Sequence, residues 1–329
     1  MPEGPYVFEV SPAEAGQKLL QFLTRRMQLP QTLLHRWIRT GQIRLNGGRA
    51  KPFVRVAVGD SVRLPPFALS MDASARSGAP EPGQSAVAEN AVQRAPVEPR
   101  LPAPSRVALP LPPLAYADAE LLVFNKPAGL PVHTGTGHTD SLATRLAAQY
   151  ADAPFLPTPA HRLDKDTSGL LLVAASYAML RALQDALRDG NLHKEYLAWV
   201  EGQWPYEAPV SLRHQLAKRY TGSDERVHVG DGRDAACVAL CLRRQPGSRE
   251  EPTGRSLMHI RLLTGRTHQI RAQMSAEGHP LCGDSKYGGR GGRALQLHAL
   301  RLVLPDGRVF TVLPSWGGAE AVTEAPPLL

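Results

Sequence analysis

The sequence predicts an α+β fold on a largely antiparallel sheet, preceded by a small second domain. At 329 residues the chain exceeds the usual size of one hydrophobic core, so two domains are expected. In the longer C-terminal part, short apolar runs follow one another with short connections and few helices between them, which is typical of antiparallel pairing. A stretch rich in Pro and Ala between the two parts predicts a linker.

The N-terminal domain is expected to span residues 1 to 67, with two helices followed by a short sheet. Ser11-Pro12-Ala13-Glu14 has the spacing of a capping box. A second helix is expected from Gln31 to Thr40, with Gly41 as its C-terminal stop. Asn46-Gly47 predicts a tight turn. The apolar positions behind these elements are Leu19, Leu20, Phe22, Leu23 and Met27, then Leu34, Trp37 and Ile38, then Ile43, Leu45, Val54, Val56, Val58, Val62 and Leu64.

This domain is strongly basic. From Lys18 to Arg63 there are ten Lys or Arg residues and one acid, Asp60, so the segment carries +9 and the rest of the chain sums to −1. A basic domain on a nearly neutral body favours a polyanionic partner, most simply nucleic acid. The alternative, solubility, is served better by interspersed charges of both signs. The candidate RNA-binding residues here are Arg25, Arg26, Arg36, Arg39, Arg44 and Lys51.

Residues 68 to 113 are expected to form a disordered linker. They include nine Pro, ten Ala and no aromatic residue. Such a stretch cannot bury enough apolar surface to offset the entropy of ordering. The linker would let the basic domain move relative to the body.

Several features indicate a cytoplasmic protein. No apolar run approaches the roughly 18 residues of a transmembrane helix, and the first ten residues lack the pattern of a signal peptide. The three cysteines, Cys237, Cys241 and Cys282, form no even disulfide framework, which favours a reducing compartment. We therefore expect a cytoplasmic monomer with no membrane partner.

The body, residues 114 to 329, should contain the main sheet. Ser176 is a candidate cap for a helix that ends before Gly190. The expected helices run from Ser141 to Gln149 and from Tyr177 to Arg188. The expected strands are Leu121 to Phe124, Leu170 to Ala175, Tyr196 to Val200, Val238 to Leu242, Met258 to Leu262 and Leu295 to Leu304.

Four segments of the body combine polar and apolar residues in a way that indicates chemistry. They read NKPAGLPVH (125–133), HRLDKDTSG (161–169), KEYLA (194–198) and TGRTHQIR (264–271). Asp164 lies between basic and hydroxyl side chains and directly before an apolar strand, a setting that suits covalent or acid–base work. Taken alone, such an Asp is about equally often a turn residue.

In this order the four segments resemble the RluA family of pseudouridine synthases, which isomerise uridine in structured RNA. The resemblance covers roughly Leu121 to Leu313. The N-terminal helices, followed by GQIRLNG and VGD, resemble the alpha-L RNA-binding module. Together they imply a pseudouridine synthase fold, with a long mixed, mainly antiparallel sheet and a central cleft, plus a small α+β RNA-binding domain.

The resemblance implies that Asp164 is the catalytic aspartate. Uracil is detached from its ribose, rotated and rejoined through carbon, a redox-neutral isomerisation that implies no cofactor and no metal. The carboxylate acts either as a nucleophile on the glycosidic carbon or as a base on the neighbouring ribose carbon, and the sequence leaves both routes open. Asp166 is assigned to turn structure.

The resemblance assigns two more catalytic residues. Arg271 matches the arginine that pairs with the aspartate, although a phosphate clamp is the alternative. Such a cation opposes the rise in pKa that burial imposes on a carboxyl group. Tyr196 matches an aromatic residue that stacks on the target base and whose hydroxyl can take part in the final proton removal; otherwise it is a core residue.

Two further arginines are candidates for RNA binding. Arg162 either fills the space that a flipped base leaves or contacts a phosphate, and Arg266 is a candidate phosphate clamp. His268 and Gln269 lie between Arg266 and Arg271, with alternating directions if the segment is a strand, and His268 is expected to be structural.

The sequence predicts that the protein is an RNA pseudouridine synthase. Its expected substrate is structured RNA, most simply large-subunit ribosomal RNA. The alternative is a non-catalytic RNA-binding protein of ribosome assembly on the same fold, which has no need of Asp164, Tyr196 and Arg271 together. A zinc deaminase is excluded because His193-Lys194-Glu195 is followed by no P-C-x-x-C pattern. The spacing of Cys237 and Cys241 also differs from that of a zinc site.

Overall fold

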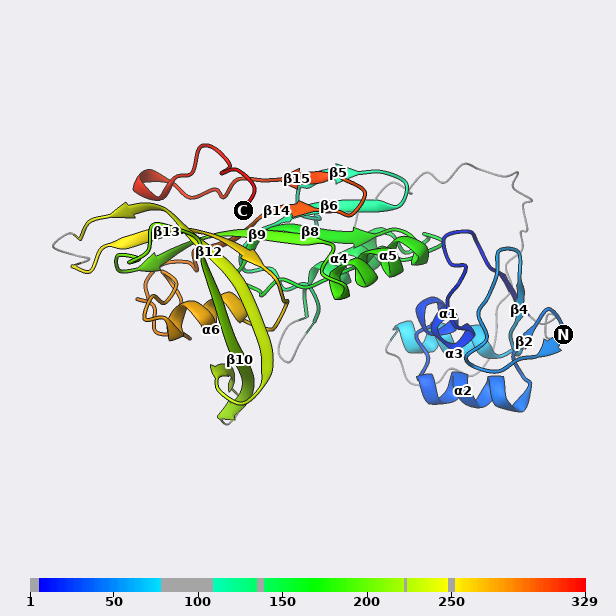
Figure 1. Ribbon diagram of the computed structural model, residues 1–329. Helices are drawn as coiled ribbons and strands as arrows, with labels where there is room; N and C mark the ends of the chain where they lie inside the picture. Colours follow the sequence, from blue (N-terminus) through cyan, green and yellow to red (C-terminus); the bar gives the residue numbers. More distant parts are fainter. Residues whose placement is uncertain (1–5, 78–108, 135–138, 222–223, 248–251) are drawn as a thin grey trace. The chain divides into compact units, whose positions relative to one another are not determined.

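The computed structural model describes residues 6–77, 109–134, 139–221, 224–247 and 252–329 (Figure 1). They form two compact units. The first is drawn from residues 6–77 with the short segments 150–157 and 175–181, and the second contains the other described residues. No helix in the described ranges is both long and apolar enough to cross a membrane.

The first unit contains a small antiparallel sheet with the strand order β1-β4-β2-β3. Helix α2 begins at Gln31 and ends at Thr40 as predicted, and Gly41 ends it in the left-handed conformation, at φ 77°. The buried core contains Phe22, Leu34 and Trp37. The elements are β1 (Val7–Glu9), α1 (Leu19–Arg26), α2 (Gln31–Thr40), β2 (Arg44–Leu45), β3 (Gly48–Arg49), β4 (Ser61–Arg63) and α3 (Ala68–Ser77).

Two details of this unit differ from the sequence prediction. The Glu14 carboxylate accepts the Ser11 N–H at 3.1 Å as in a capping box, but residues 12–16 form turns and α1 begins only at Leu19. The Glu14 carboxylate is also part of a tertiary contact, because it is buried and pairs with Arg26 of α1. Val54 and Val58 are exposed and belong to no strand. The prediction that they lie on the buried face of the small sheet is therefore wrong.

The predicted linker is wrong at its start, because residues 68–77 form helix α3. Tertiary contacts stabilise it. Ala68 is fully buried, and the Asp72 carboxylate accepts the backbone N–H of Gln28. Just before the helix, Phe67 makes an edge contact with the Trp37 ring. Residues 78–108, most of the predicted linker, lie outside the described residues.

The second unit is built on one long mixed sheet, which confirms the predicted fold class. Its described strands follow the order β11-β10-β12-β13-β9-β14-β8-β6-β5, with β15 beside β14 and β7 beside β8. Strands β14 and β8 pair in parallel, and the other pairs are antiparallel. The strands are β5 (Leu114–Ala117), β6 (Leu121–Lys126), β7 (Thr158–Pro159), β8 (Ser168–Ala174), β9 (His193–Glu201), β10 (Val210–Thr221), β11 (Asp224–Val229), β12 (Arg233–Gln245), β13 (Arg255–Leu262), β14 (Leu297–Val303) and β15 (Val309–Thr311).

The helices after residue 114 are α4 (Leu142–Gln149), α5 (Tyr177–Arg188) and α6 (Gln269–Ala276), with a short 3₁₀ turn at Gly318–Glu320. Residues 177–181 of α5 belong to the first unit, and the remainder of the helix belongs to the second. Figure 1 shows α4 and α6 on one side of the sheet and the C-terminal segment on the other. Trp316 and Val322 of that segment pack on a cluster that includes Leu197 and Trp199 of β9. Because strand residues alternate in direction, Lys194 and Tyr196 face the opposite side.

The parallel pair β8–β14 fixes the position of the segment that carries Asp164. Gly169 pairs with Ala299 at the start of β8. Its φ is +107°, and a Cβ there would lie 2.3 Å from the Ala299 carbonyl oxygen. Only glycine fits so close an approach. The loop of residues 161–167 therefore leads directly into a closely packed strand.

Candidate active site

The Asp164 loop is held by its own backbone and by the half-buried His161. The Asp164 carbonyl accepts the Thr167 N–H at 3.1 Å, which closes a turn. The His161 Nε2 accepts the Leu172 N–H of β8 at 3.2 Å. Burial, and secondarily the charge of Lys194, lower the His161 pKa to about 3. The imidazole is therefore neutral at ordinary pH and remains an acceptor.

A buried lysine holds the other side of this loop. Lys126 ends β6 and is completely buried, and its ammonium donates to the carbonyls of Pro127, Leu130 and Lys165 at 2.8–2.9 Å. Burial lowers the Lys126 pKa to about 8, against the opposing charges of Asp166 and Asp164. The NKP segment thus positions the loop next to Asp164 rather than contacting the cavity.

The TGRTHQIR segment is a turn followed by helix α6, not a strand. The buried Gln269 side chain organises the turn, because its Oε1 accepts from the Thr264 hydroxyl and from the Arg266 N–H at 2.8 and 3.0 Å. His268 precedes the helix in the left-handed conformation, at φ 49°, which is strained for a residue with a Cβ. This turn directs both His268 and Arg271 toward Asp164.

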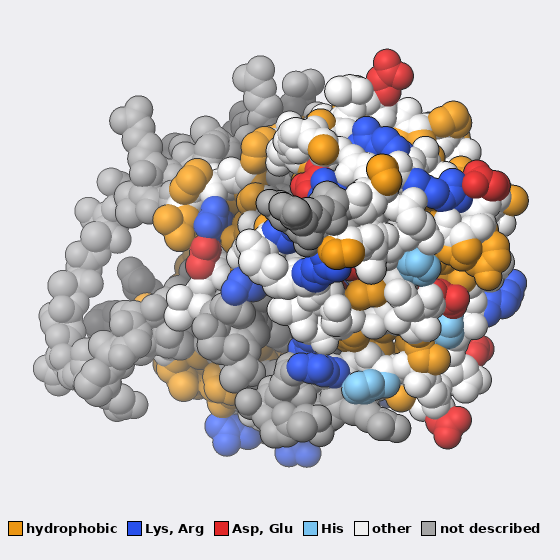
Figure 2. Space-filling model, turned by 90° about the vertical axis from the view of Figure 1, so that its left-hand side faces the viewer, with side chains coloured by type: hydrophobic (Ala, Val, Ile, Leu, Met, Phe, Trp, Pro, Cys, Tyr) orange, Lys and Arg blue, Asp and Glu red, His pale blue; other side chains and the backbone are white. Residues whose placement is uncertain are grey.

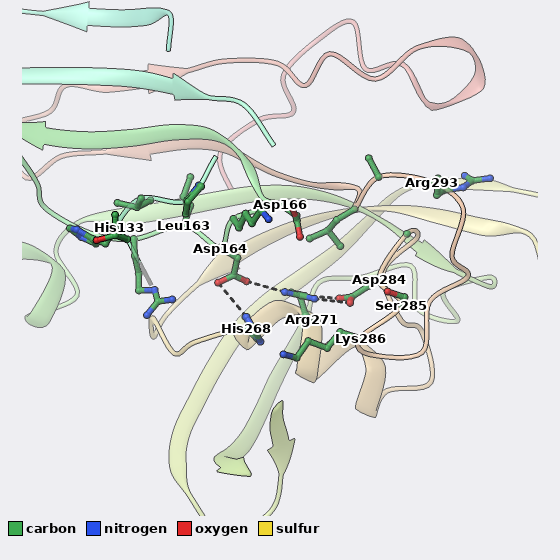
Figure 3. Close-up of a pocket in the computed structure, with 18 residues that line it drawn as sticks. His133, Leu163, Asp164, Asp166, His268, Arg271, Asp284, Ser285, Lys286 and Arg293 are labelled. Atoms are coloured by element: carbon green, nitrogen blue, oxygen red, sulfur yellow. Dashed lines mark hydrogen bonds and ion pairs between the residues drawn. The ribbon is translucent and has the colours of Figure 1, made fainter. Parts of the chain in front are cut away.

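Two side-chain nitrogens face the Asp164 carboxylate, one from the Arg271 guanidinium and one from the His268 imidazole. Arg271 Nη1 lies 3.6 Å from Oδ2 and His268 Nε2 lies 3.9 Å from Oδ1 (Figure 3). Both distances exceed those of a direct hydrogen bond. The carboxylate is half-buried and stays accessible to a substrate.

Arg271 has a second and closer partner that the sequence reasoning missed. Its Nε and Nη2 donate to the two carboxylate oxygens of Asp284 at 2.7 and 2.8 Å, and the Asp284 side chain is fully buried. Burial lowers the Arg271 pKa, but the Asp284 hydrogen bonds and the charges of Asp284 and Asp164 outweigh it and the net shift is upward. Asp284 therefore keeps the guanidinium charged and oriented toward Asp164. A single Asp among glycines and lysines carries no spacing signal that identifies this role.

His268 belongs to a hydrogen-bonded chain behind the carboxylate. Its Nδ1 lies 2.9 Å from the Tyr287 hydroxyl, which accepts the Val227 N–H at 2.9 Å. Burial lowers the His268 pKa, with Asp164 opposing the shift. When the hydroxyl donates to Nδ1, the neutral ring carries its proton on Nε2 and points it at Asp164. His268 thus faces Asp164 from this chain, and the structural role expected from the sequence stays a prediction.

Two cavities meet at Asp164. One, here called the Asp284 cavity, has a volume of about 660 Å³ and is also lined by His133, Asp284 and Lys286. The other, the Tyr196 cavity, has a volume of about 570 Å³ and is also lined by Tyr196 and Lys194. Arg162, Asp164, His268 and Arg271 line both. The three predicted catalytic residues therefore converge on the Tyr196 cavity.

Tyr196 lies in the middle of the central strand β9 and is nearly buried, with 6% of its surface exposed. Burial, and secondarily the Asp164 charge, raise its pKa. The phenol therefore keeps its proton at neutral pH. Stacking on a base is compatible with this environment, whereas a phenolate is not favoured there.

The predicted RNA-binding arginines of the body lie at the outer part of the site. Arg162 is exposed and lines both cavities. Arg266 is also exposed and lines the Tyr196 cavity, and its Nε donates to the Asp234 carbonyl at 3.0 Å. On the face in Figure 2, Lys and Arg side chains lie among acidic and apolar ones, in keeping with the nearly neutral charge of the body.

The six candidate cations of the N-terminal unit fall into two groups. Arg36, Arg39 and Lys51 are exposed. The other three have internal contacts: Arg26 pairs with Glu14 at 2.6 Å, the Arg25 guanidinium lies 4.9 Å from the centre of the Phe155 ring, and Arg44 donates to the Gly47 carbonyl. The exposed group is better placed to meet a polyanion. In the described ranges, no three His, Cys, Asp or Glu side chains are grouped to hold a metal ion.

Comparison with known proteins places this geometry in context. Residues 120–276 match the model of the RNA pseudouridylate synthase family. The "Ribosomal large subunit pseudouridine synthase C" of Pasteurella multocida is 34% identical over 281 residues, 85% of this chain and 77% of that protein. The protein of the same name from Escherichia coli K12 is 33% identical over 290 residues, 86% of this chain and 80% of its own length. Among solved structures, human RNA pseudouridylate synthase domain containing 1 is similar, with a TM-score of 0.50, 26% identity and coverage of 60% of this chain and 81% of that one.

Proposed function

Because the chain belongs to the RNA pseudouridylate synthase family, we propose that this isomerase converts uridine to pseudouridine in large-subunit ribosomal RNA. The names of the bacterial relatives support the choice of RNA, and the similarity extends over most of this chain and of theirs. The convergence of Asp164, Tyr196 and Arg271 on one cavity supports the catalytic assignment. A non-catalytic assembly protein would not require that convergence.

In the proposed reaction the target uridine enters the Tyr196 cavity with its base against the Tyr196 ring. Asp164 attacks the glycosidic carbon or removes a proton from the neighbouring ribose carbon, and in either case the bond from N1 to C1′ breaks. Arg271 keeps a positive charge beside the carboxylate. Arg162, at the junction of the two cavities, fills the space left by the flipped base, and Arg266 binds a phosphate.

The target can be tested with purified protein and three kinds of unmodified transcript: large-subunit ribosomal RNA, small-subunit ribosomal RNA and transfer RNA. Pseudouridine mapping should find conversion at discrete uridines of the large-subunit RNA only. Conversion confined to either of the other two RNAs would overturn the proposed target, and conversion in none would overturn the proposed activity.

The basic N-terminal unit is proposed to anchor the RNA electrostatically. Changing Arg36, Arg39 and Lys51 together to Gln should weaken RNA binding and lower the salt dependence of the affinity by about three counterions, since each cation that meets a phosphate releases roughly one. The single-turnover rate at saturating RNA should stay within about twofold, because the cations act on binding.

A matched control is Arg308→Gln, which removes a half-buried cation that is already paired with Asp118 and Asp306. Affinities measured across a salt series decide between the outcomes. If the triple variant keeps the salt dependence of the wild type, this unit is not the anchor. If its saturated rate falls instead, the unit shapes the reactive complex.

A further inference from the structure

Lys194 lies in the site, but none of the roles proposed above involves it. It lies two residues before Tyr196 on β9, so the two side chains point to the same side of the sheet. Both line the Tyr196 cavity, together with Asp164. A base stacked on Tyr196 would therefore lie close to the Lys194 ammonium.

This ammonium differs from the other inner cations of the site. Arg271 pairs with Asp284, and Lys126 donates to three carbonyls. Lys194 is half-buried, yet no residue within the described ranges makes a hydrogen bond or an ion pair with it. Burial lowers its pKa. Holding a partly desolvated cation without a partner costs free energy, which indicates that its partner arrives with the substrate.

The chemistry of the reaction identifies a suitable partner. When N1 separates from C1′, the electron pair of that bond goes to uracil, whether Asp164 has attacked C1′ or has removed the proton of the neighbouring ribose carbon. The charge spreads over the ring and its two carbonyl oxygens. When C5 then forms its bond to C1′, the ester bond between Asp164 and C1′ breaks in the first route, and the neighbouring ribose carbon takes its proton back in the second. C5 afterwards releases its proton, and N1 takes one up.

We propose that the Lys194 ammonium contacts a carbonyl oxygen of the target uracil in the Tyr196 cavity and stabilises the negative charge of the detached base. This assignment rests on the proposed function. A fixed cation in a partly dehydrated site is most effective at an atom where charge develops during the reaction. The exposed Arg162 and Arg266 are better suited to phosphates, which remain charged throughout.

A substitution at Gly265 offers a second way to perturb the Lys194 ammonium, without changing Lys194 itself. A Cβ built on Gly265 would lie 2.9 Å from Lys194 Nζ and meets no other atom within 4 Å, and the glycine is not in the left-handed conformation. Gly265→Ala therefore shifts the ammonium without removing its charge. Lys194→Met removes the charge and keeps most of the apolar volume of the side chain.

The test is single-turnover kinetics at saturating RNA, with affinity measured across a salt series and thermal unfolding as a check on folding. Lys194→Met should slow the saturated step by roughly a hundredfold, the scale of losing one group that stabilises developing charge. Affinity and its salt dependence should stay close to those of the wild type. Lys194→Arg should recover part of the rate, because it keeps the charge.

Two further variants sharpen the result. Gly265→Ala should slow the same step to a smaller extent, and it should have almost no effect in the Lys194→Met background, since the two changes act on one interaction. Arg188→Met is the matched control. It removes another cation from the wall of the same cavity, but one already paired with Asp185 and Asp189, and the rate should change by less than about threefold.

A wild-type rate for Lys194→Met would overturn the proposal. So would weaker binding with a reduced salt dependence and a normal saturated rate, because that result identifies a phosphate contact. Asp164→Asn in the same assay separates this outcome from a failure of the proposed function. If Asp164→Asn is inactive and Lys194→Met is normal, only the role of Lys194 is wrong; if Asp164→Asn turns over, the catalytic assignment itself is wrong.

Discussion

Asp164→Asn is expected to abolish pseudouridine formation while leaving the fold and the affinity for RNA nearly unchanged. The amide keeps the shape of the side chain but loses the charge that either route requires, so the rate should fall by about a thousandfold or more. The fold should tolerate the change, because the carboxylate contacts with Arg271 and His268 are longer than hydrogen bonds. The turn itself depends on the Asp164 backbone carbonyl, which the substitution keeps.

Release of tritium from C5-labelled uridine in RNA measures turnover directly, since the label leaves when C5 joins the ribose. Asp166→Asn is the matched control, two residues away and exposed. It should release tritium at nearly the wild-type rate. Wild-type release from Asp164→Asn, or an equal loss in both variants, would contradict the assignment of the catalytic carboxylate.

Much of the fold was predictable because its elements carry local signals. Helix α5 begins and ends where predicted, with Ser176 accepting the Met179 N–H as its cap and Gly190 just beyond the end. The central strands β6, β8 and β9 lie where apolar runs predict them. The family expected from the four motifs is confirmed by the comparisons with known proteins.

Strands β10 and β11 and helix α6 escaped the pattern analysis for physical reasons. Strands β10 and β11 project from the rest of the sheet (Figure 1), and Ala272 of α6 packs with Leu216 and Val227 of these strands. Their sequences are mostly polar, so they carry too few apolar residues for a clear alternation. Helix α6 is buried almost all round, but its buried residues include Gln269, Arg271 and Gln273, whose side-chain N–H groups donate to specific partners. Apolar periodicity cannot reveal a helix whose interior face is polar.

The site was predictable only as far as the motifs extended. Asp164, Tyr196 and Arg271 are carried by recognisable segments, and their side chains meet at one cavity. Asp284 and Tyr287 are distant in the sequence and contribute through tertiary contacts alone. The contact between Arg271 and Asp164 was anticipated, but the closer pair with Asp284 was not.

Arg271→Met is expected to lose both activity and stability, because Arg271 serves two carboxylates. It removes the cation beside Asp164 and leaves the fully buried Asp284 without its bidentate partner. Breaking a buried ion pair by removing one member costs about 3–5 kcal/mol. A loss of activity in this variant alone would therefore not separate catalysis from folding.

The double variant Arg271→Met with Asp284→Asn separates the two effects. Asparagine removes the buried charge, so much of the free energy of unfolding should return, while Asp164 still lacks its cation. Denaturant unfolding should thus show partial recovery of stability, and the single-turnover rate at saturating RNA should stay low, at least about a hundredfold below that of the wild type. If activity returns together with stability, Arg271 acts only by anchoring the loop that contains Asp284. If neither returns, the pair is indispensable to the fold, and the Asp164 contact must be tested with Arg271→Lys, which keeps the charge but cannot make the bidentate pair.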